Sequence, residues 1–407
     1  MRILFVTNNL PVPPTNGQAI RTLSILQSLA SLGHQLSFVS FATGGGSRDL
    51  EPLTSCCESI DLLDRPLTNM SQGADYLRRA ACVLSHKPYS VERFRSSPMR
   101  EKIADHLKSE KPDAVFCDSV YALVNVPETR IPILLNTHNV EYAIYERYYK
   151  LERNPVKKLY AGAEAKLTRE AERKSCYRAV GVLACSQKDR EALGNLCPDV
   201  PVSVVPNTVD TDFYLPSSDA NRGSQEPVML FQGSMDWYPN RDAVEYFVQD
   251  ILPKIRAVAP NAKFIVAGRN PPPQFVAELT AVRGVEFTGT VADMRPYLAS
   301  ATIVVVPLRL GSGTRIKILE ACAAGKPVVS THVGAEGLDL HDGREIVLAD
   351  EPSEFASAVA ALLADPVRAS SMARAARAVI DERYSQHALR VSLKNVLENF
   401  HNQKRTN

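Results

Sequence analysis

Short runs of apolar residues recur along the chain, each bounded by polar turns and followed by a helical pattern. This alternation is typical of parallel α/β units, in which helices cover a buried sheet. The pattern predicts strands at residues 2–7, 35–42, 113–118, 132–138, 181–186, 202–207, 228–234, 263–269, 285–290, 302–308, 327–333 and 345–350. It predicts helices at residues 18–32, 241–258, 316–324, 352–363 and 386–401. The expected fold class is therefore α/β with parallel sheets.

The predicted elements form two similar halves. Residues 214–227 are polar and lack apolar periodicity, which indicates a connector. We expect an N-terminal domain at 1–206, a hinge or linker at 207–227, and a second domain at 228–385. The last helical stretch, 386–407, is expected to cross back to the first domain. Two such halves would leave a cleft between the carboxyl edges of their sheets, where doubly wound folds bind ligands.

Composition excludes several classes of protein. The chain has 407 residues, 45% hydrophobic and 23% charged, as in soluble folded proteins with more than one domain. Because 47 Lys and Arg are balanced by 45 Asp and Glu, a dedicated nucleic-acid binder is disfavoured. The eight cysteines lack metal-ligand spacing and are expected to be reduced thiols. No apolar stretch approaches the roughly 18 residues of a membrane span, so the cytoplasm is the expected compartment.

One interval of the first half is basic. Residues 65–111 contain about ten Lys or Arg against about five acids. Such an interval fits either a membrane-surface patch or a solvated surface. Peripheral contact with the inner membrane face is therefore an open alternative to a fully cytoplasmic position.

Two candidate residues follow strands of the first half. Gly17 ends the loop after the first strand, where backbone N–H groups could meet an anion at a helix N-terminus. The alternative is a glycine required only by the turn. His138 ends the strand 132–138 and could bind a phosphate or a sugar or carry a proton, although a lone histidine is usually structural. A G-x-G-x-x-G dinucleotide fingerprint is absent here.

The strongest local pattern is a Gly-Ser-Gly loop between a buried strand and a short helix. Gly311 and Gly313 would let backbone N–H groups of the loop point at an anion, and the helix adds its positive end. Arg315 and Lys317 could neutralise a departing diphosphate. Glu320 lies in the first turns of the helix, positioned to accept hydrogen bonds from a ribose diol. The combination predicts a phosphate site, and a structural loop is the alternative.

One apparent metal motif is better explained as a turn. Asp210-Thr211-Asp212 forms a D-x-D sequence, which in some transferases holds a divalent ion. It follows the strand 202–207 directly, at the expected hinge, where Asp-rich turns are common. We therefore expect no metal site.

The order of these motifs resembles that of GT-B glycosyltransferases, in particular the large retaining group called family 4 or group 1. The similarity covers nearly the whole chain. Its pieces are the first strand with its loop and Gly17, Gly33-His34, NTHNVE, ACS, VPNTVD, FQGS, IVAG, VEFTG and VVVPLRLGSGTRIKILEACAAGKPVVST. The string LEA-x-A-x-G-x-P-V-V within the last piece is among the more diagnostic of the family.

The resemblance implies two Rossmann-like domains with parallel sheets facing a cleft. The nucleotide sugar would lie mostly on the C-terminal domain and the acceptor mostly on the N-terminal one. The implied reaction moves a sugar from a nucleoside diphosphate sugar to an acceptor hydroxyl with retention of anomeric configuration, without bound metal or other cofactor. A saccharide, a lipid-linked saccharide or a small molecule would be the acceptor, in polysaccharide or glycolipid assembly. Nucleic acid is not an implied partner.

The resemblance also implies roles for single residues. Gly17 would approach the donor phosphates, His138 the transferred sugar, and Glu320 the ribose. Asn207 would face the cleft from the hinge. The implied catalytic residues are His138, Arg315, Lys317 and Glu320. The implied donor-binding residues are Gly17, Asn207, Gly233, Ser234, Gly268, Arg269, Thr288, Gly289, Gly311, Ser312, Gly313 and Thr314, with Thr288 and Gly289 reading the base edge through the backbone.

Two departures from the family pattern leave other functions open. The first of the family's paired glutamates would fall at Ser312, and no acid occurs from Ile303 to Leu319. The family's basic pair after the first strand of the second domain is also missing, since Arg241 lies late for that role. One alternative is a nucleotide-sugar epimerase, although the acid-free loop disfavours it. The other is an inactive nucleotide-sugar-binding regulator.

Overall fold

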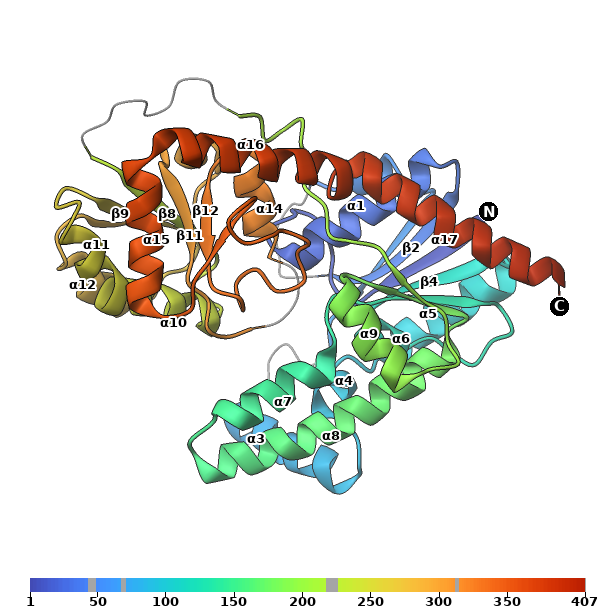
Figure 1. The fold of residues 1–407 in the computed structure, drawn as a ribbon. Coiled ribbons are helices and arrows are strands. Elements are labelled where there is room, and N and C mark those ends of the chain that lie inside the picture. Colours follow the sequence, from blue (N-terminus) through green and yellow to red (C-terminus); the bar gives the residue numbers. More distant parts are fainter. Residues whose placement is uncertain (43–48, 67–70, 217–225, 312–314, 407) are drawn as a thin grey trace. The chain divides into compact units, whose positions relative to one another are not determined.

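The structure is a computed structural model that describes residues 1–406 except 43–48, 67–70, 217–225 and 312–314 (Figure 1). The chain forms two compact units. Unit 1 contains Met1–Pro206 and Leu389–Asn407, and unit 2 contains Asn207–Ala388. No helix of the described residues combines the length and the apolar character that a bilayer span requires.

Unit 1 is built on a sheet of seven parallel strands in the order β3-β2-β1-β4-β5-β6-β7. The strands are β1 (Arg2–Thr7), β2 (Gln35–Ala42), β3 (Ser59–Asp64), β4 (Ala114–Asp118), β5 (Ile133–Asn136), β6 (Gly181–Ala184) and β7 (Val202–Val204). The strand order reverses between β1 and β4. Ligands bind at such switch points in doubly wound sheets.

The sheet register of unit 1 stacks aromatic rings in its core. Phe5 of β1 pairs with Phe38 of β2 and with Phe116 of β4. The ring centroids lie 6.0 and 4.9 Å apart, and all three side chains are fully buried. This packing fixes β1 against β4, and with them the strand ends at the switch point.

The helices of unit 1 are α1 (Gly17–Ser31), α2 (Glu51–Thr54), α3 (Gln72–Leu84), α4 (Tyr89–Glu92), α5 (Ser97–Ser109), α6 (Val120–Leu123), α7 (Glu141–Leu151), α8 (Pro155–Arg178), α9 (Gln187–Leu196) and most of α17 (Gln386–Thr406). In α17, Leu389, Leu393 and Leu397 recur every fourth residue and are buried in the same core as Phe5. The helices α3, α4, α7 and α8 pack together as a group that extends from the sheet (Figure 1).

Unit 2 contains six parallel strands in the order β10-β9-β8-β11-β12-β13, with its switch point between β8 and β11. The strands are β8 (Val228–Gln232), β9 (Lys263–Ala267), β10 (Val285–Gly289), β11 (Ile303–Val306), β12 (Val328–Ser330) and β13 (Val347–Leu348). The helices are α10 (Tyr238–Tyr246), α11 (Leu252–Arg256), α12 (Pro273–Thr280), α13 (Arg295–Ser300), α14 (Ile316–Ala323), α15 (Pro352–Ala364) and α16 (Pro366–Arg383).

The predicted α/β class with parallel sheets is confirmed. Two details of the prediction were wrong. The single helix expected at 241–258 is α10 and α11, joined by a π-helical turn at Phe247–Ile251. The strand expected at 345–350 pairs only at Val347–Leu348, at the edge of the sheet. The pattern also missed the strand β3 at the other sheet's edge.

Candidate functional site

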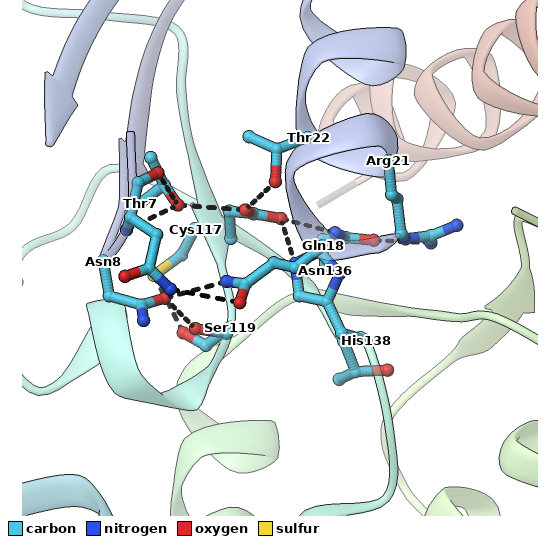
Figure 2. A network of polar contacts seen from close by, with 12 residues as sticks. Thr7, Asn8, Gln18, Arg21, Thr22, Cys117, Ser119, Asn136 and His138 are labelled. Carbon is cyan, nitrogen blue, oxygen red and sulfur yellow. Dashed lines mark hydrogen bonds and ion pairs between the residues drawn. The ribbon is translucent and has the colours of Figure 1, made fainter. Parts of the chain in front are cut away.

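Polar side chains gather at the switch point of unit 1 around the buried carboxylate of Asp118 (Figure 2). Asp118 is the last residue of β4, next to Thr7 at the end of β1. Its Oδ2 accepts hydrogen bonds from the hydroxyl of Thr7 at 3.0 Å and of Thr22 at 2.6 Å. Its Oδ1 accepts from Asn136 at 2.6 Å and lies 3.0 Å from Nε2 of His138. The carboxylate therefore holds His138 by one ring nitrogen.

The charge of Asp118 is stabilised in spite of its burial. Burial alone would raise the pKa of Asp118, but the electrostatic effect of the neighbouring His138 and the hydrogen bonds from His138, Thr22 and Asn136 lower that pKa to about 2. Arg21, which is also buried, donates to Oδ1 of Asn136 and to the carbonyl of Val205, both at 2.7 Å. Asn136 thus links a buried cation to a buried anion.

The backbone after Asp118 is strained at the switch point. Ser119 has φ 101° and ψ 159°, a region in which residues other than glycine rarely occur. Its hydroxyl donates to Oδ1 of Asn8 at 2.9 Å, and Gln18 donates to the same atom at 3.3 Å. These bonds connect β4, the loop after β1 and the first turn of α1 (Figure 2). Such outliers cluster at functional sites.

Gly17 is the first residue of α1, as its sequence position implied, and it is exposed. Oδ1 of Asn16 accepts the N–H of Ala19 at 3.0 Å. The N–H groups of Gly17 and Gln18 in the first turn have no partner within the helix, because no preceding turn supplies a carbonyl. An anion at this end of α1 would meet these groups and the positive end of the helix.

The segment that carries His138 is fixed by a buried carboxylate. Val140 provides no side-chain cap for α7. Instead Glu172 of α8 accepts the N–H groups of Glu141 at 3.1 Å and of Tyr142 at 3.2 Å. Burial, reinforced by the charge of Glu141, raises the pKa of Glu172 to about 8. The turn between His138 and α7 is therefore anchored at its far end.

In unit 2, Glu320 of α14 lies beside the end of β8. Its Oε2 accepts from Nε2 of Gln232 at 2.7 Å, and its Oε1 accepts from the hydroxyl of Tyr214 at 3.2 Å. The same amide nitrogen of Gln232 donates to the carbonyl of Lys317 at 3.1 Å, so Gln232 ties β8 to α14. Burial raises the pKa of Glu320 to about 7, although the hydrogen bonds from Tyr214 and Gln232 and the charge of Lys317 act in the opposite direction.

Lys317 is a half-buried cation one turn before Glu320. Its Nζ donates to Oδ1 of Asn240 at 2.8 Å and lies 4.2 Å from the centre of the Phe231 ring. Burial and the neighbouring charge of Arg315 together lower the pKa of Lys317 to about 7, although the charge of Glu320 acts in the opposite direction. An anion that binds beside such a lysine would raise its pKa and so restore its full positive charge.

Arg315 stands directly before α14 and is 6% exposed. Its guanidinium carbon lies 5.3 Å from the ring centre of Trp237. Gly311 has φ +110°, and a Cβ at this position would lie 2.6 Å from Nη2 of Arg315 and 2.8 Å from the Trp237 ring. Only glycine therefore fits where the chain passes this pair. Ser312, Gly313 and Thr314 lie outside the described residues.

In unit 2 a glycine directly follows β8 and β9 and is the last residue of β10. The N–H of Gly233, after β8, donates to the carbonyl of Ala267 at 2.9 Å, and the N–H of Gly268 donates to that of Gly289 at 3.2 Å. A Cβ on Gly268 would lie 1.8 Å from the carbonyl oxygen of Gly233. The backbones of these two donor-binding candidates are therefore in direct contact.

Two of the remaining candidates of unit 2 contact each other. Ser234 accepts from Nε of Arg269 at 3.1 Å, so these two meet as the resemblance implies for one site. The hydroxyl of Thr288 donates a hydrogen bond to the carbonyl of Gly289. Asn207 is buried at the start of unit 2.

Comparison with known proteins identifies the family. Residues 15–213 match the model of "Glycosyltransferase Family 4", and residues 226–365 match that of "Glycosyl transferases group 1". The chain is a GT-B glycosyltransferase of the group 1, family 4 type. An uncharacterized 44.6 kDa protein in the cps region of Klebsiella pneumoniae is 21% identical to the glycosyltransferase over 87% of this chain and 89% of its own length.

One further relative matches part of the glycosyltransferase, and two solved structures match nearly all of it. The lipopolysaccharide core biosynthesis mannosyltransferase LpsB of Rhizobium meliloti is 27% identical over 42% of this chain, and the match spans about half of that protein, 53%. Sucrose-phosphate synthase of Thermosynechococcus elongatus has the same fold, with a TM-score of 0.77 over 99% of this chain and 100% of that one at 17% identity. HepE of Anabaena in complex with UDP-glucose has a TM-score of 0.65 over 98% and 100% of the two chains at 16% identity.

The D-x-D sequence of the glycosyltransferase forms a turn. Oδ1 of Asp210 accepts the N–H groups of Asp212 at 3.0 Å and Phe213 at 2.9 Å. Across the described part of the chain, no three His, Cys, Asp or Glu side chains come together as metal ligands would.

Sequence reasoning missed the residues that hold the candidate groups of the glycosyltransferase. They are Thr7, Arg21, Thr22, Asp118, Asn136, Tyr214, Gln232, Trp237 and Asn240. A signal existed for Asp118 and Gln232, because each ends a central strand beside a switch point. Arg21 could have been found as the one charge within the apolar pattern of α1.

The close approach of Gly268 to Gly233 predicts a sharp steric effect. We expect Gly268→Ala to lower the free energy of unfolding by about 1–3 kcal/mol, because the added Cβ forces the backbone of β8 or β9 to shift. Gly194→Ala in α9 is the control, since a Cβ there meets nothing within 4 Å and should stabilise the helix by up to about 1 kcal/mol. Urea unfolding of both variants tests this, and a Gly268→Ala protein as stable as wild type contradicts it.

Proposed function

We propose that this glycosyltransferase moves a sugar from a nucleoside diphosphate sugar to an acceptor hydroxyl with retention of anomeric configuration and without a metal ion. The observation that carries the proposal is the pair of cationic side chains, buried Arg315 and half-buried Lys317, at the N-terminus of α14 beside the switch point of unit 2. Two basic groups and a helix N-terminus at one place suit a diphosphate. HepE, which shares the fold, was solved with UDP and with UDP-glucose.

The proposed chemistry is electrostatic. As the bond between the sugar and the diphosphate lengthens, negative charge grows on the leaving oxygen and the sugar becomes oxocarbenium-like. Arg315 and Lys317 would stabilise that negative charge from fixed positions. The acceptor oxygen would then form its bond to the anomeric carbon on the face that the diphosphate leaves, and the acceptor proton would pass to the departing phosphate. This order gives retention.

The other candidate residues would bind the donor. Glu320, held by Tyr214 and Gln232, would accept hydrogen bonds from the ribose diol. The glycine-lined strand ends at Gly233, Gly268 and Gly289 would present their backbone to the nucleotide. In the same scheme the donor would also meet the side chains of Ser234, Arg269 and Asn207 and the backbone of Thr288.

The unit 1 residues would serve the sugar and the acceptor. His138 would contact the transferred sugar, with its ring fixed by Asp118. The first turn of α1 at Gly17 would approach the donor phosphates. A saccharide or lipid-linked saccharide is the proposed acceptor, because LpsB acts in lipopolysaccharide core biosynthesis. We also propose that the enzyme acts at a membrane surface.

Donor binding should weaken both above and below neutral pH. Lys317, with its pKa lowered to about 7, loses its charge as the pH rises through neutrality. Glu320, with its pKa raised to about 7, loses its charge as the pH falls through neutrality. Affinity for a nucleoside diphosphate should therefore peak near pH 7, as calorimetric titration at a series of pH values would show. Lys317→Arg should shift the alkaline limb to higher pH, because arginine stays charged. A wild-type profile that is flat on both sides of neutrality contradicts the expectation.

The activity is tested with a panel of UDP-, GDP- and ADP-sugars, each with and without saccharide acceptors. Nucleotide release that depends on the acceptor, together with a product of the donor's anomeric configuration by NMR, supports the proposal. A free nucleotide sugar with an altered sugar would indicate an epimerase. Binding without any turnover would indicate a regulator.

A further inference from the structure

The helix α3 presents its apolar side to solvent. Tyr76, Leu77 and Leu84 are 71%, 75% and 80% exposed, and Leu84 is the most exposed of the large apolar side chains described. Gly73, Ala80 and Ala81 are exposed as well. At about 100° per residue, these six positions form one uninterrupted arc of about 140° around the helix. We name this arc, residues 73, 76, 77, 80, 81 and 84, the α3 outer face.

Asp75, Arg78 and Arg79 of α3 contact neighbouring parts of the protein. Nε of Arg79 lies 2.7 Å from Oδ2 of Asp75, and the hydroxyl of Tyr89 in α4 bonds the other oxygen of that carboxylate. The Arg79 guanidinium also lies over the rings of Tyr89 and Tyr160, at 4.6 and 5.8 Å. Arg78 reaches the carbonyl of Glu92. These contacts fix the rotation of α3, so the apolar arc cannot turn toward the protein.

The surroundings of the α3 outer face are basic. On a helical projection, Arg78 and Arg79 flank the arc on its two sides. Residues 72–87 carry three Arg or Lys and one Asp, and residues 147–158, which join α7 to α8, carry five Arg or Lys and one Glu. That connection also exposes apolar side chains, with Val156 75% exposed, one turn before the Tyr160 that contacts α3.

We propose that the α3 outer face docks on an anionic lipid bilayer, with the helix lying in the plane of the headgroups. Exposed apolar side chains beside a basic segment match such an interface, because the leucines enter the acyl boundary while the basic side chains of residues 147–158 remain among phosphates. The excess of positive charge selects a negatively charged surface over a second copy of this equally basic segment, which it would repel. The inference deepens the proposed function by naming the surface on which a lipid-linked acceptor is met, and it rests on that function for its purpose.

Vesicle sedimentation tests the docking without any donor. The wild-type protein should pellet with vesicles of phosphatidylglycerol and phosphatidylcholine, much less with phosphatidylcholine alone, and less as salt is raised. The Leu77→Glu/Leu84→Glu variant should lose binding by a factor of about ten or more, since two side chains that would enter the bilayer become anionic. Its control is Val258→Glu/Val367→Glu in unit 2, which has the same charge change at sites 68% and 78% exposed and should bind as wild type does.

Further outcomes separate this inference from others. Leu77→Ser/Leu84→Ser, which adds no charge, should also reduce binding. The proposal is wrong if the wild-type protein binds neither kind of vesicle. It is also wrong if the Leu77→Glu/Leu84→Glu variant binds vesicles as tightly as its control. A dimer by light scattering that this variant abolishes would assign the face to a second copy instead. Nucleoside diphosphate affinity is measured on the same proteins and should be unchanged, so a failure of the proposed donor site would be seen separately.

Discussion

The Arg315→Ala variant is expected to turn over its donor about 10²- to 10³-fold more slowly than the wild-type enzyme, the usual cost of removing one positioned electrostatic contact. Arg315 is 6% exposed and stands directly before the N-terminus of α14, where its charge adds to that of the helix. Because the growing charge of the leaving diphosphate exists mainly in the transition state, the loss should fall on kcat more than on KM.

Glu320→Ala should also reduce turnover, by a factor between tens and thousands, with a larger share of the effect in KM because the proposed ribose contact exists before the reaction. Arg374→Ala is the matched control, since Arg374 is exposed on α16 and bonds only Ser370 of the same helix among the contacts described. Steady-state kinetics with the donor found in the nucleotide-sugar panel measures all three variants. Wild-type rates in both Arg315→Ala and Glu320→Ala would refute the site.

Asp118→Asn is expected to lower the free energy of unfolding by about 3 kcal/mol. The carboxylate accepts four side-chain contacts, and an amide NH₂ cannot accept the hydrogen bonds that Thr7 or Thr22 now donates. The wild-type protein should show the same group in its pH dependence. Because the pKa of Asp118 falls from 3.8 to about 2 on folding, its contribution of about 2 kcal/mol is present above pH 3.8 and is lost as the pH falls toward 2.

Urea unfolding at neutral pH and at a series of acidic pH values measures both effects. Asp105→Asn on the exposed side of α5 is the control and should leave stability near that of wild type. The Asp118→Asn protein should also lose activity beyond its loss of stability, since the negative charge that holds the ring of His138 is removed. An Asp118→Asn protein with wild-type stability contradicts the network described here.

The sequence predicted most strands because buried parallel strands are continuous apolar runs. It failed where polar side chains point inward. The buried face of α8 carries Glu164, Thr168 and Glu172, so this long helix shows no apolar stripe. In α3 the pattern is reversed, with the apolar side in solvent. The strand β3 is half-buried along its length and lacks a continuous apolar run.

The candidate site was predicted in part for a similar reason. Arg315, Lys317 and Glu320 are close in sequence and lie on α14 or directly before it, and Gly311 lies beside Arg315. The partners of these residues come from distant segments, as Tyr214 and Gln232 do for Glu320. Local patterns contain no information on such pairs, so only the fold could reveal them.

We propose that unit 2 binds the diphosphate of a nucleotide sugar through the basic residues before and within α14. Titration of UDP, GDP and ADP, followed by the fluorescence of Trp237, tests it directly, because Trp237 is the single tryptophan of the chain and packs on Arg315. At least one nucleoside diphosphate should change the emission and bind about tenfold or more tightly than its monophosphate, and Lys317→Met should abolish the difference. If no diphosphate binds, or if Lys317→Met binds it as tightly as wild type, the assignment of this site is wrong.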